Sequence, residues 1–317
     1  MTKAGLKVTI IAEHVHQLLA RHIGLHVKSS FVEPVPPLFV ALQGPQGIGK
    51  TSLTSSLQDA LHSAAQRKGP PTSPFQADAG LTRRPKVAVL SLDDFYLPHS
   101  AMLTLTRASH TVTVSSEEES SPQPNKLLSG RGLPGTHDLS LLASALSIIS
   151  RINNPVSPSQ STTTPEAPAL SNVQSQTFPS VVTPKYDKSA FAGEGDRDME
   201  FNTLSGPIDV VVLEGWCMGF HPVSKSVLQS IWDRVSGVAE LAPNSALDAG
   251  GGPAKLEVPE AELERAVIKR LGITIADVAQ INHYLHEYLD KIYPFFTGGF
   301  IQVRNIYLAS IPHTHFA

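Results

Sequence analysis

The sequence contains one cysteine, Cys217, and no long uncharged apolar run. A single cysteine excludes an intramolecular disulfide and is typical of proteins from a reducing compartment. The N-terminus lacks the apolar segment of a secretion signal, and no stretch is long and apolar enough to cross a bilayer. We therefore expect a cytoplasmic protein that does not bind membranes.

Positive charge and aromatic residues are also scarce. Lys and Arg number 25 against 28 Asp and Glu, the net charge is −3, and no basic block occurs. This balance argues against electrostatic binding to nucleic acid or anionic lipid. Aromatic residues make up 6% of the chain and prolines number 25, so part of the 317 residues is not expected to enter a core. The remainder, 41% hydrophobic and 17% charged overall, is typical of a globular enzyme domain.

The clearest positive feature is a glycine-rich turn between an apolar run and a helical pattern. The turn matches G-x-x-x-x-G-K-[ST] without exception. Glycines allow successive backbone N–H groups to surround a phosphate, and the helix that follows adds the positive end of its dipole. We expect Lys50 to reach the β- and γ-phosphates of ATP and the Thr51 hydroxyl to bind Mg²⁺. The residues expected to contact the nucleotide are Gly44, Pro45, Gln46, Gly47, Ile48, Gly49, Lys50, Thr51 and Ser52.

Apolar periodicity predicts an α/β fold with a doubly wound, mostly parallel sheet of the P-loop kinase type. Continuous β-branched runs, typical of strands covered on both faces, occur at 38–42, 87–92 and 208–213, with a shorter one at 300–303. Helical spacing is found at 7–28 and 275–292 and in the three leucines Leu53, Leu57 and Leu61. Strands that alternate with helices favour this architecture.

Three divisions of the chain follow from composition. We predict an N-terminal helical segment at 1–34, a kinase domain at 35–303 and an atypical tail at 304–317. Segments rich in Ser, Thr, Pro and Gln, near 101–125 and 152–183, have too few large apolar residues to offset ordering entropy. We interpret these two segments as disordered surface insertions.

Two adjacent carboxylates, Asp93 and Asp94, follow the second apolar run. Open α/β sheets bind ligands at the carboxyl ends of their strands, where a carboxylate can accept a proton from an attacking hydroxyl. The alternative is that either Asp caps the next helix or turn. Because the glycine-rich motif is present, we favour at least one functional carboxylate.

Another acidic residue, Glu214, ends the third apolar run and is followed by Gly215. An acid at this position of a P-loop protein holds Mg²⁺ directly or through water. We expect Gly215 to leave room for the approaching ligand.

Two further segments are dense in glycine and polar residues, at 130–138 and at 184–197. Each contains cations, which suit an anionic substrate or the phosphates of ATP. We interpret both segments as loops shaped around a ligand, although glycine, proline and aspartate also populate ordinary turns.

Together these motifs resemble the D-glycerate 3-kinase family of P-loop kinases, which are similar to uridine kinase, pantothenate kinase and phosphoribulokinase. The resemblance rests on five motifs in order: GPQGIGKTS, SLDDFY, GRGLPGTHD, PKYDKS with GEGDR, and VVVLEGWCMGF. It implies that ATP and Mg²⁺ are used to phosphorylate a hydroxyl of a small metabolite, with D-glycerate the first candidate.

The resemblance also implies roles for individual residues. By similarity to uridine kinase, Asp93 rather than Asp94 is the base, and Glu214 lies at the metal. The same similarity places Tyr186, His137 and Arg197 in the substrate region. We add Asp94, Tyr96 and Arg131 as further candidate substrate residues.

One departure from the family concerns the C-terminal part. Such kinases continue after their last strand into an arginine-containing lid helix, whereas no Arg or Lys follows Arg304 here. We expect a chain without this lid to bind ATP but to transfer phosphate slowly. The alternatives are therefore an ATP-binding protein with little transferase activity and a uridine-type nucleoside kinase.

We predict that Lys50→Ala weakens Mg·ATP binding because it removes a charge-assisted contact. The loss should be about ten- to a hundred-fold in affinity, measured by calorimetric titration. Equal affinities for the wild type and Lys50→Ala would contradict the assignment of the phosphate site.

Overall fold

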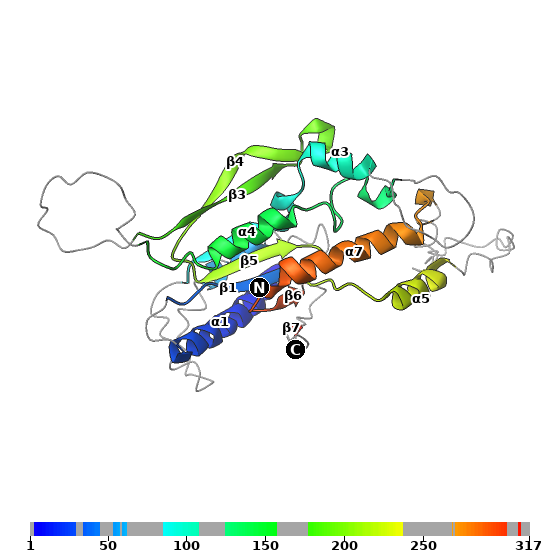
Figure 1. The fold of residues 1–317 in the computed structure, drawn as a ribbon. Helices are drawn as coiled ribbons and strands as arrows, with labels where there is room; N and C mark the ends of the chain where they lie inside the picture. Colours follow the sequence, from blue (N-terminus) through cyan, green and yellow to red (C-terminus); the bar gives the residue numbers. More distant parts are fainter. Residues whose placement is uncertain are drawn as a thin grey trace, which may run out of the picture.

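A computed structural model describes residues 3–29, 34–44, 53–57, 59–61, 85–107, 124–156, 177–236, 268, 270–302 and 310–311 (Figure 1). Its main helices are α1 (Lys3–Ser29), α3 (His99–Arg107), α4 (Leu139–Ile149), α5 (Lys225–Ser236) and α7 (Ile275–Lys291). Its strands are β1 (Leu38–Gln43), β2 (Val87–Ser91), β3 (Ser180–Asp187), β4 (Asp196–Ser205), β5 (Val210–Gly215), β6 (Phe300–Gln302) and β7 (Ser310–Ile311). The predicted helices at 7–28 and 275–292 are confirmed, as are the four predicted strands.

The main sheet has the strand order β2-β5-β1-β6-β7. Strands β2, β5, β1 and β6 are parallel, and the two-residue β7 pairs antiparallel with β6. The chain therefore passes from β5 on one side of β1 to β6 on the other. The doubly wound, mostly parallel sheet predicted from the sequence is confirmed.

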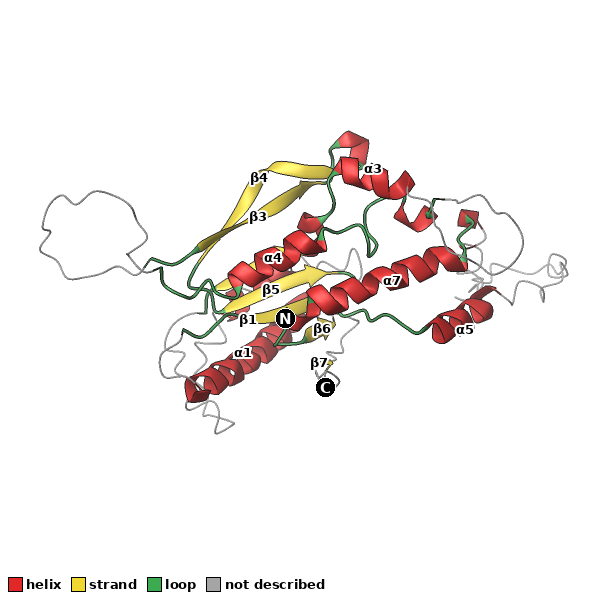
Figure 2. Ribbon diagram, viewed as in Figure 1, coloured by secondary structure: helices red, strands yellow, loops and turns green. Residues whose placement is uncertain are grey.

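Both faces of this sheet are covered by helices, which explains why its strands are continuously apolar. Along β1, Leu38, Val40 and Leu42 enter one core, while Phe39 and Ala41 enter the other. The first core includes α1 and the helix with the three leucines, and the second includes α4 and α7. Figure 2 shows helices on both sides of the strands.

Helix α1 packs on the sheet through residues at four-residue spacing. Ile11, Val15 and Leu19 are buried in the first core, as the apolar stripe of a surface helix requires. Near its end, the imidazole Nε2 of His22 lies 2.9 Å from the carbonyl oxygen of Pro36. Among the described residues, no helix is both long and apolar enough to span a membrane.

A second, two-stranded sheet is formed by the antiparallel hairpin β3–β4, which lies beyond α4 from the main sheet (Figure 1). On β3, Val181 and Thr183 are buried and Val182 is exposed, so the strand shows the alternation of a half-covered sheet. The segment 184–197, interpreted as a loop shaped around a ligand, contains the end of β3, a connection at 188–195 and the start of β4. Its contact with a ligand stays a prediction.

The predicted insertions are narrower than composition indicated. Residues 101–107 belong to α3, whose Met102 is buried. Ile152 is buried in the second core, and the Asn153 side chain bonds the carbonyls of Val35 and Ile208 at 2.8 Å each. Residues 180–183 belong to β3. Residues 108–123 and 157–176 of these insertions, and residues 303–309 and 312–317, lie outside the described residues.

Two of the sequence motifs are joined by backbone pairing. Tyr96 forms a bridge with His137. The Leu97 amide donates to the Thr136 carbonyl at 2.9 Å, and the Asp138 amide donates to the Phe95 carbonyl at 2.7 Å. The segment after β2 is thus held directly against the glycine-rich segment that precedes α4.

Gly135 fixes this second segment against α7. Its φ is +102°, and a Cβ added there would lie 2.4 Å from Cδ2 of Tyr284. Both the backbone conformation and the close approach of the ring require glycine.

We predict that Gly135→Ala destabilises the protein by about 1–3 kcal/mol, since it combines a strained φ with a clash. Gly130→Ala is the matched control, because Gly130 has no positive φ and no atom lies within 4 Å of its added Cβ. The control should change the free energy of unfolding by less than about 0.5 kcal/mol in urea titrations. Similar losses in both variants would contradict the packing argument.

Candidate active site

The carboxyl ends of β1, β2 and β5 lie at one edge of the main sheet. Glu214 pairs with Leu42 of β1 and with Ser91 of β2, and the Ser91 hydroxyl donates to Glu214 Oε1 at 2.9 Å. Gly44, the first residue of the nucleotide motif, follows β1 at this edge. Because β5 and β6 flank β1, the edge is the topological switch point at which such sheets bind ligands.

Most of the nucleotide motif, 45–52, lies outside the described residues. The contacts expected of Lys50 and Thr51 therefore stay predictions. The helix expected after the motif is described in part, and its three leucines are buried in the first core. The strand before the motif and the helix after it thus pack in the same core, as in a strand–turn–helix that binds phosphate.

Asp93 lies in a 3₁₀ turn, η1 (Leu92–Phe95), directly after β2. Its Oδ1 accepts a hydrogen bond from the Tyr96 hydroxyl at 3.1 Å, and its Oδ2 pairs with Lys188 Nζ at 2.7 Å. Burial opposes ionisation of Asp93, but the hydrogen bond and charge of Lys188, with the Tyr96 hydroxyl, hold its pKa below the usual value. Asp93 is thus an ionised carboxylate with both oxygens engaged.

Asp94, its neighbour, is in a different environment. Burial raises the pKa of Asp94, and the nearby charges of Asp93 and Glu214 raise it further, against a hydrogen bond from the Tyr186 amide. The two adjacent carboxyls therefore have pKa values displaced in opposite directions, a pattern common at functional sites.

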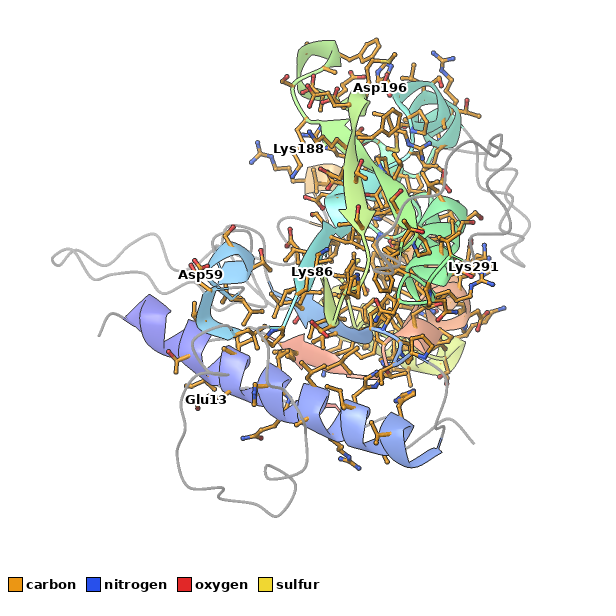
Figure 3. All side chains as sticks on the ribbon, turned by 90° about the vertical axis from the view of Figure 1, so that its left-hand side faces the viewer. Glu13, Asp59, Lys86, Lys188, Asp196 and Lys291 are labelled. Carbon is orange, nitrogen blue, oxygen red and sulfur yellow. The ribbon has the colours of Figure 1, made fainter. Side chains whose placement is uncertain are left out.

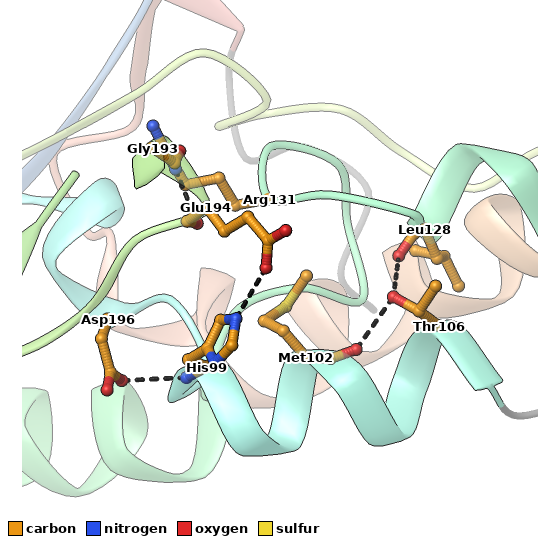
Figure 4. Close-up of polar contacts among 8 residues, drawn as sticks. All are labelled: His99, Met102, Thr106, Leu128, Arg131, Gly193, Glu194 and Asp196. Carbon is orange, nitrogen blue, oxygen red and sulfur yellow. Dashed lines mark hydrogen bonds and ion pairs between the residues drawn. The ribbon is translucent and has the colours of Figure 1, made fainter. Parts of the chain in front are cut away.

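Neither Asp93 nor Asp94 caps the next helix, α3, which was the alternative role considered for them. The amide of His99, the first residue of α3, donates to Asp196 Oδ1 at 2.9 Å (Figure 4). His99 Nε2 also lies 2.6 Å from Glu194 Oε2. The start of α3 is therefore satisfied by the β3–β4 hairpin, and Asp93 and Asp94 point elsewhere.

Tyr96 and His137 form a buried aromatic pair beside Asp93. Their rings are stacked with centroids 4.3 Å apart, and His137 Nδ1 lies 2.7 Å from the hydroxyl of Tyr288 on α7. Burial lowers the pKa of His137 to about 3, although the charge of Asp93 opposes this shift. The ring is therefore neutral at physiological pH.

The hairpin adds Tyr186 and Arg197, which lie opposite each other on β3 and β4. The Tyr186 ring meets the Tyr96 ring edge to face at 5.2 Å. Arg197 Nη2 donates to Asp138 Oδ2 at 2.7 Å. Arg131 Nη1 donates to the carbonyls of Gly193 and Glu194 at 2.6 and 2.7 Å (Figure 4).

Three polar atoms in this cluster are buried and have no hydrogen-bond partner. They are His137 Nε2, Tyr186 Oη and Arg197 Nε. A buried unpaired polar atom carries a free-energy penalty unless a ligand or water satisfies it. The structure therefore brings together the residues expected around the substrate: Asp93, Asp94, Tyr96, Arg131, His137, Tyr186 and Arg197.

A solved structure with this arrangement of elements is the D-glycerate 3-kinase from Cryptococcus neoformans var. grubii, with a TM-score of 0.57. The two chains are 30% identical, and the match covers 93% of this chain and 72% of the Cryptococcus chain. This chain belongs to the D-glycerate 3-kinase family of P-loop kinases. The family suggested by the five sequence motifs is confirmed.

Curated members and relatives of this family match a shorter part of the chain. The Saccharomyces cerevisiae protein named "Probable ATP-dependent kinase TDA10" is 35% identical over 191 residues, which are 60% of this chain and 49% of that protein. The chloroplastic D-glycerate 3-kinase of Arabidopsis thaliana is 28% identical over 201 residues, 63% of this chain and 32% of that protein. The chain thus spans half or less of these two relatives. No family model matches it.

In this D-glycerate 3-kinase family member, Glu214 is the candidate protein ligand for Mg²⁺ at the carboxyl edge of the sheet. Mg²⁺ in kinases is held by one or two carboxylates together with substrate phosphates rather than by a protein cage. In the described part of the chain, no group of three or more His, Cys, Asp or Glu forms such a cage. A buried carboxylate at the switch point, beside the start of the nucleotide motif, fits that donor set.

The expectation that Gly215 leaves room for a ligand stays a prediction, and the structure adds a packing reason for glycine at this position. A Cβ at this position would lie 2.9 Å from Cβ and Cδ2 of Leu92 and 2.9 Å from Cγ of Met218. Glycine is required by the packing of η1 and Met218 against the end of β5.

Two residues of the site were missed in the sequence analysis, Lys188 and Tyr288. Lys188 stands in the PKYDKS motif, but no local pattern relates it to Asp93, 95 residues earlier. Tyr288 lies one turn after the apolar Leu285 on the buried face of α7. A tyrosine on a buried helical face needs a polar partner, and that signal could have indicated Tyr288.

We predict that His137 makes stability depend on pH. In the unfolded chain its imidazole takes up a proton near pH 6.5, whereas the folded pKa is about 3. As pH falls below about 6.5, His137 should therefore lower the free energy of unfolding by up to about 1.4 kcal/mol per pH unit.

The comparison variant is His137→Asn, whose side chain keeps a polar atom near the Nδ1 position. Urea unfolding from pH 7 to pH 4 should show a shallower slope for His137→Asn than for the wild type. Parallel slopes would show that the native imidazole is protonated in this range, against the assignment of a neutral ring.

Proposed function

We propose that this chain is an ATP-dependent kinase that transfers the γ-phosphoryl group of ATP to a hydroxyl of D-glycerate. The observation that carries the proposal is that three buried polar atoms, on His137, Tyr186 and Arg197, have no hydrogen-bond partner. D-Glycerate offers a carboxylate and two hydroxyls, which match this set in number and type. Membership of the family supports the same acceptor.

Each unpaired atom suits a defined part of the acceptor. The Arg197 guanidinium is cationic and supports binding of the carboxylate. Arg131 adds positive charge to the same region, because the charges of both arginines act on the Tyr186 hydroxyl. The neutral imidazole of His137 can donate or accept at Nε2, according to which nitrogen bears the proton, and so suits a hydroxyl. The Tyr186 hydroxyl offers a second contact of this kind.

Asp93 is the proton acceptor in this proposal. Its lowered pKa keeps it ionised, and a positioned base must lie within hydrogen-bond reach of the attacking hydroxyl. Mg²⁺, when bound with ATP, would neutralise charge on the β- and γ-phosphates, with Glu214 and Thr51 as its protein ligands. Asp94, whose pKa is raised, is the less suitable base and is assigned to the substrate contacts.

The acceptor is tested by ADP release from the full chain with D-glycerate, L-glycerate, uridine, pantothenate or no acceptor. D-Glycerate should accelerate ADP release above the rate without acceptor, and uridine should not. Acceleration by uridine alone would favour the nucleoside kinase. ATP binding with no acceleration by any acceptor would favour a binding protein.

The cytoplasmic location expected from the sequence stays a prediction.

We predict that Asp93→Asn leaves ATP affinity nearly unchanged and lowers turnover about 10²–10⁴-fold, the usual contribution of a positioned base. Asp94→Asn is the matched control on the adjacent residue and should retain most of the turnover. If Asp94→Asn abolished turnover while Asp93→Asn did not, the two roles would have to be exchanged.

A further inference from the structure

Lys188 contacts one of the two Asp93 oxygens that could accept the proton of the acceptor hydroxyl. The Lys188 ammonium lies 2.7 Å from Oδ2, while the Tyr96 hydroxyl holds Oδ1. An acceptor hydroxyl must come within hydrogen-bond reach of one of these oxygens to lose its proton. The ion pair therefore takes up one acceptor position of Oδ2 and lowers the proton affinity of Asp93, so proton transfer to Oδ2 is favoured when Lys188 moves away.

Two features of the Lys188–Asp93 ion pair allow Lys188 to move: its exposure to solvent and its place at the end of β3. The Lys188 side chain is 56% exposed and that of Asp93 is 34% exposed, and ion pairs this open to solvent contribute little to stability. Lys188 directly follows β3, at the end of the hairpin where Asp196 also lies (Figure 3). A four-carbon side chain at a strand end can exchange one partner for another at small energetic cost.

The two arginines of the cluster have other partners. Arg131 is bonded to the Gly193 and Glu194 carbonyls, and Arg197 is paired with Asp138. Negative charge is concentrated at the carboxyl edge of the sheet, because the charges of both Asp93 and Glu214 raise the pKa of Asp94. Lys188 is the cation that contacts the base itself, and the transferring phosphoryl group must pass next to that base.

On the basis of the proposed function, we propose that Lys188 is a further catalytic residue, which leaves Asp93 and contacts the transferring phosphoryl group. The acceptor hydroxyl oxygen forms a bond to the γ-phosphorus, and the bond from that phosphorus to the β,γ-bridging oxygen breaks. The hydroxyl proton passes to Asp93 Oδ2, and the electron pair of the broken bond stays on ADP.

Lys188 thereby has two successive partners. Before transfer it keeps Asp93 ionised, and during transfer it balances charge on the equatorial phosphoryl oxygens, a contribution that cations make in phosphoryl transfer. This contribution would come from the β3–β4 hairpin.

The test compares Lys188→Ala, Lys188→Arg and Lys185→Ala in the full chain. Lys185 is the matched control, because it lies on β3, three residues before Lys188, and pairs with the exposed Glu200 at 2.8 Å. Three quantities are measured: turnover with D-glycerate, affinity for Mg·ADP with and without fluoroaluminate, and the pKa of Asp93 in the nucleotide-free protein by carbon-13 NMR. Fluoroaluminate mimics the transferring phosphoryl group, so its effect on affinity reports transition-state contacts without catalysis.

Lys188→Ala should lower turnover about 10²–10³-fold, as removal of one transition-state donor does. The gain in Mg·ADP affinity that fluoroaluminate gives should fall by a similar factor. The affinity for Mg·ADP alone should stay nearly unchanged, and the pKa of Asp93 should rise. Lys188→Arg should restore part of the turnover and of the fluoroaluminate gain. Lys185→Ala should leave all three quantities close to those of the wild type.

A Lys188→Ala variant with wild-type turnover and fluoroaluminate gain would overturn the proposal. Equal loss of affinity for Mg·ADP with and without fluoroaluminate, or an early thermal transition, would show a structural role and overturn it as well. If D-glycerate proved inert but Lys188→Ala still lost the fluoroaluminate gain, the acceptor would be wrong and the role of Lys188 would stand.

Discussion

The structure depends on the parallel register of β2, β5 and β1. Glu214 is aligned with Ser91 on one side and with Leu42 on the other, so three chain segments leave the sheet at the same level. This register holds because successive side chains enter two separate cores, and a one-residue slip would exchange every one of them. The chemistry at the carboxyl edge is therefore fixed by apolar packing below it.

Above the sheet, the site is assembled by polar contacts between segments distant in sequence. Backbone pairing of Tyr96 with His137 joins two motifs, and Tyr288 of α7 anchors His137. The hairpin is tied to the start of α3 by Asp196. Each contact satisfies a buried or terminal polar group. Of the five buried side-chain polar atoms without a partner in the described residues, three belong to residues proposed to bind the acceptor, and the other two belong to Gln43 and Thr183.

Much of the fold could be predicted, because β1, β2 and β5 are buried on both faces and read as continuous apolar runs. The β3–β4 hairpin could not, since Val181 and Val182 stand within a segment rich in Ser, Thr and Pro, and only one face is covered. The candidate residues were identified from motifs, but their partners were not. No local pattern indicates that Lys188 meets Asp93 or that Leu92 packs on Gly215, because these contacts arise only from tertiary structure.

The hairpin that carries Tyr186 and Arg197 is a two-stranded sheet, and an isolated sheet of this size is marginally stable. Its outward face exposes Val182, Met199 and Phe201, so its order relies on the inner face and on the contacts with α3. Regions of this kind open locally before the rest of a protein unfolds. The proposed acceptor would thus be recognised by the part of the molecule whose backbone amides should exchange with solvent earlier than those of the central sheet, and a bound acceptor would slow that exchange.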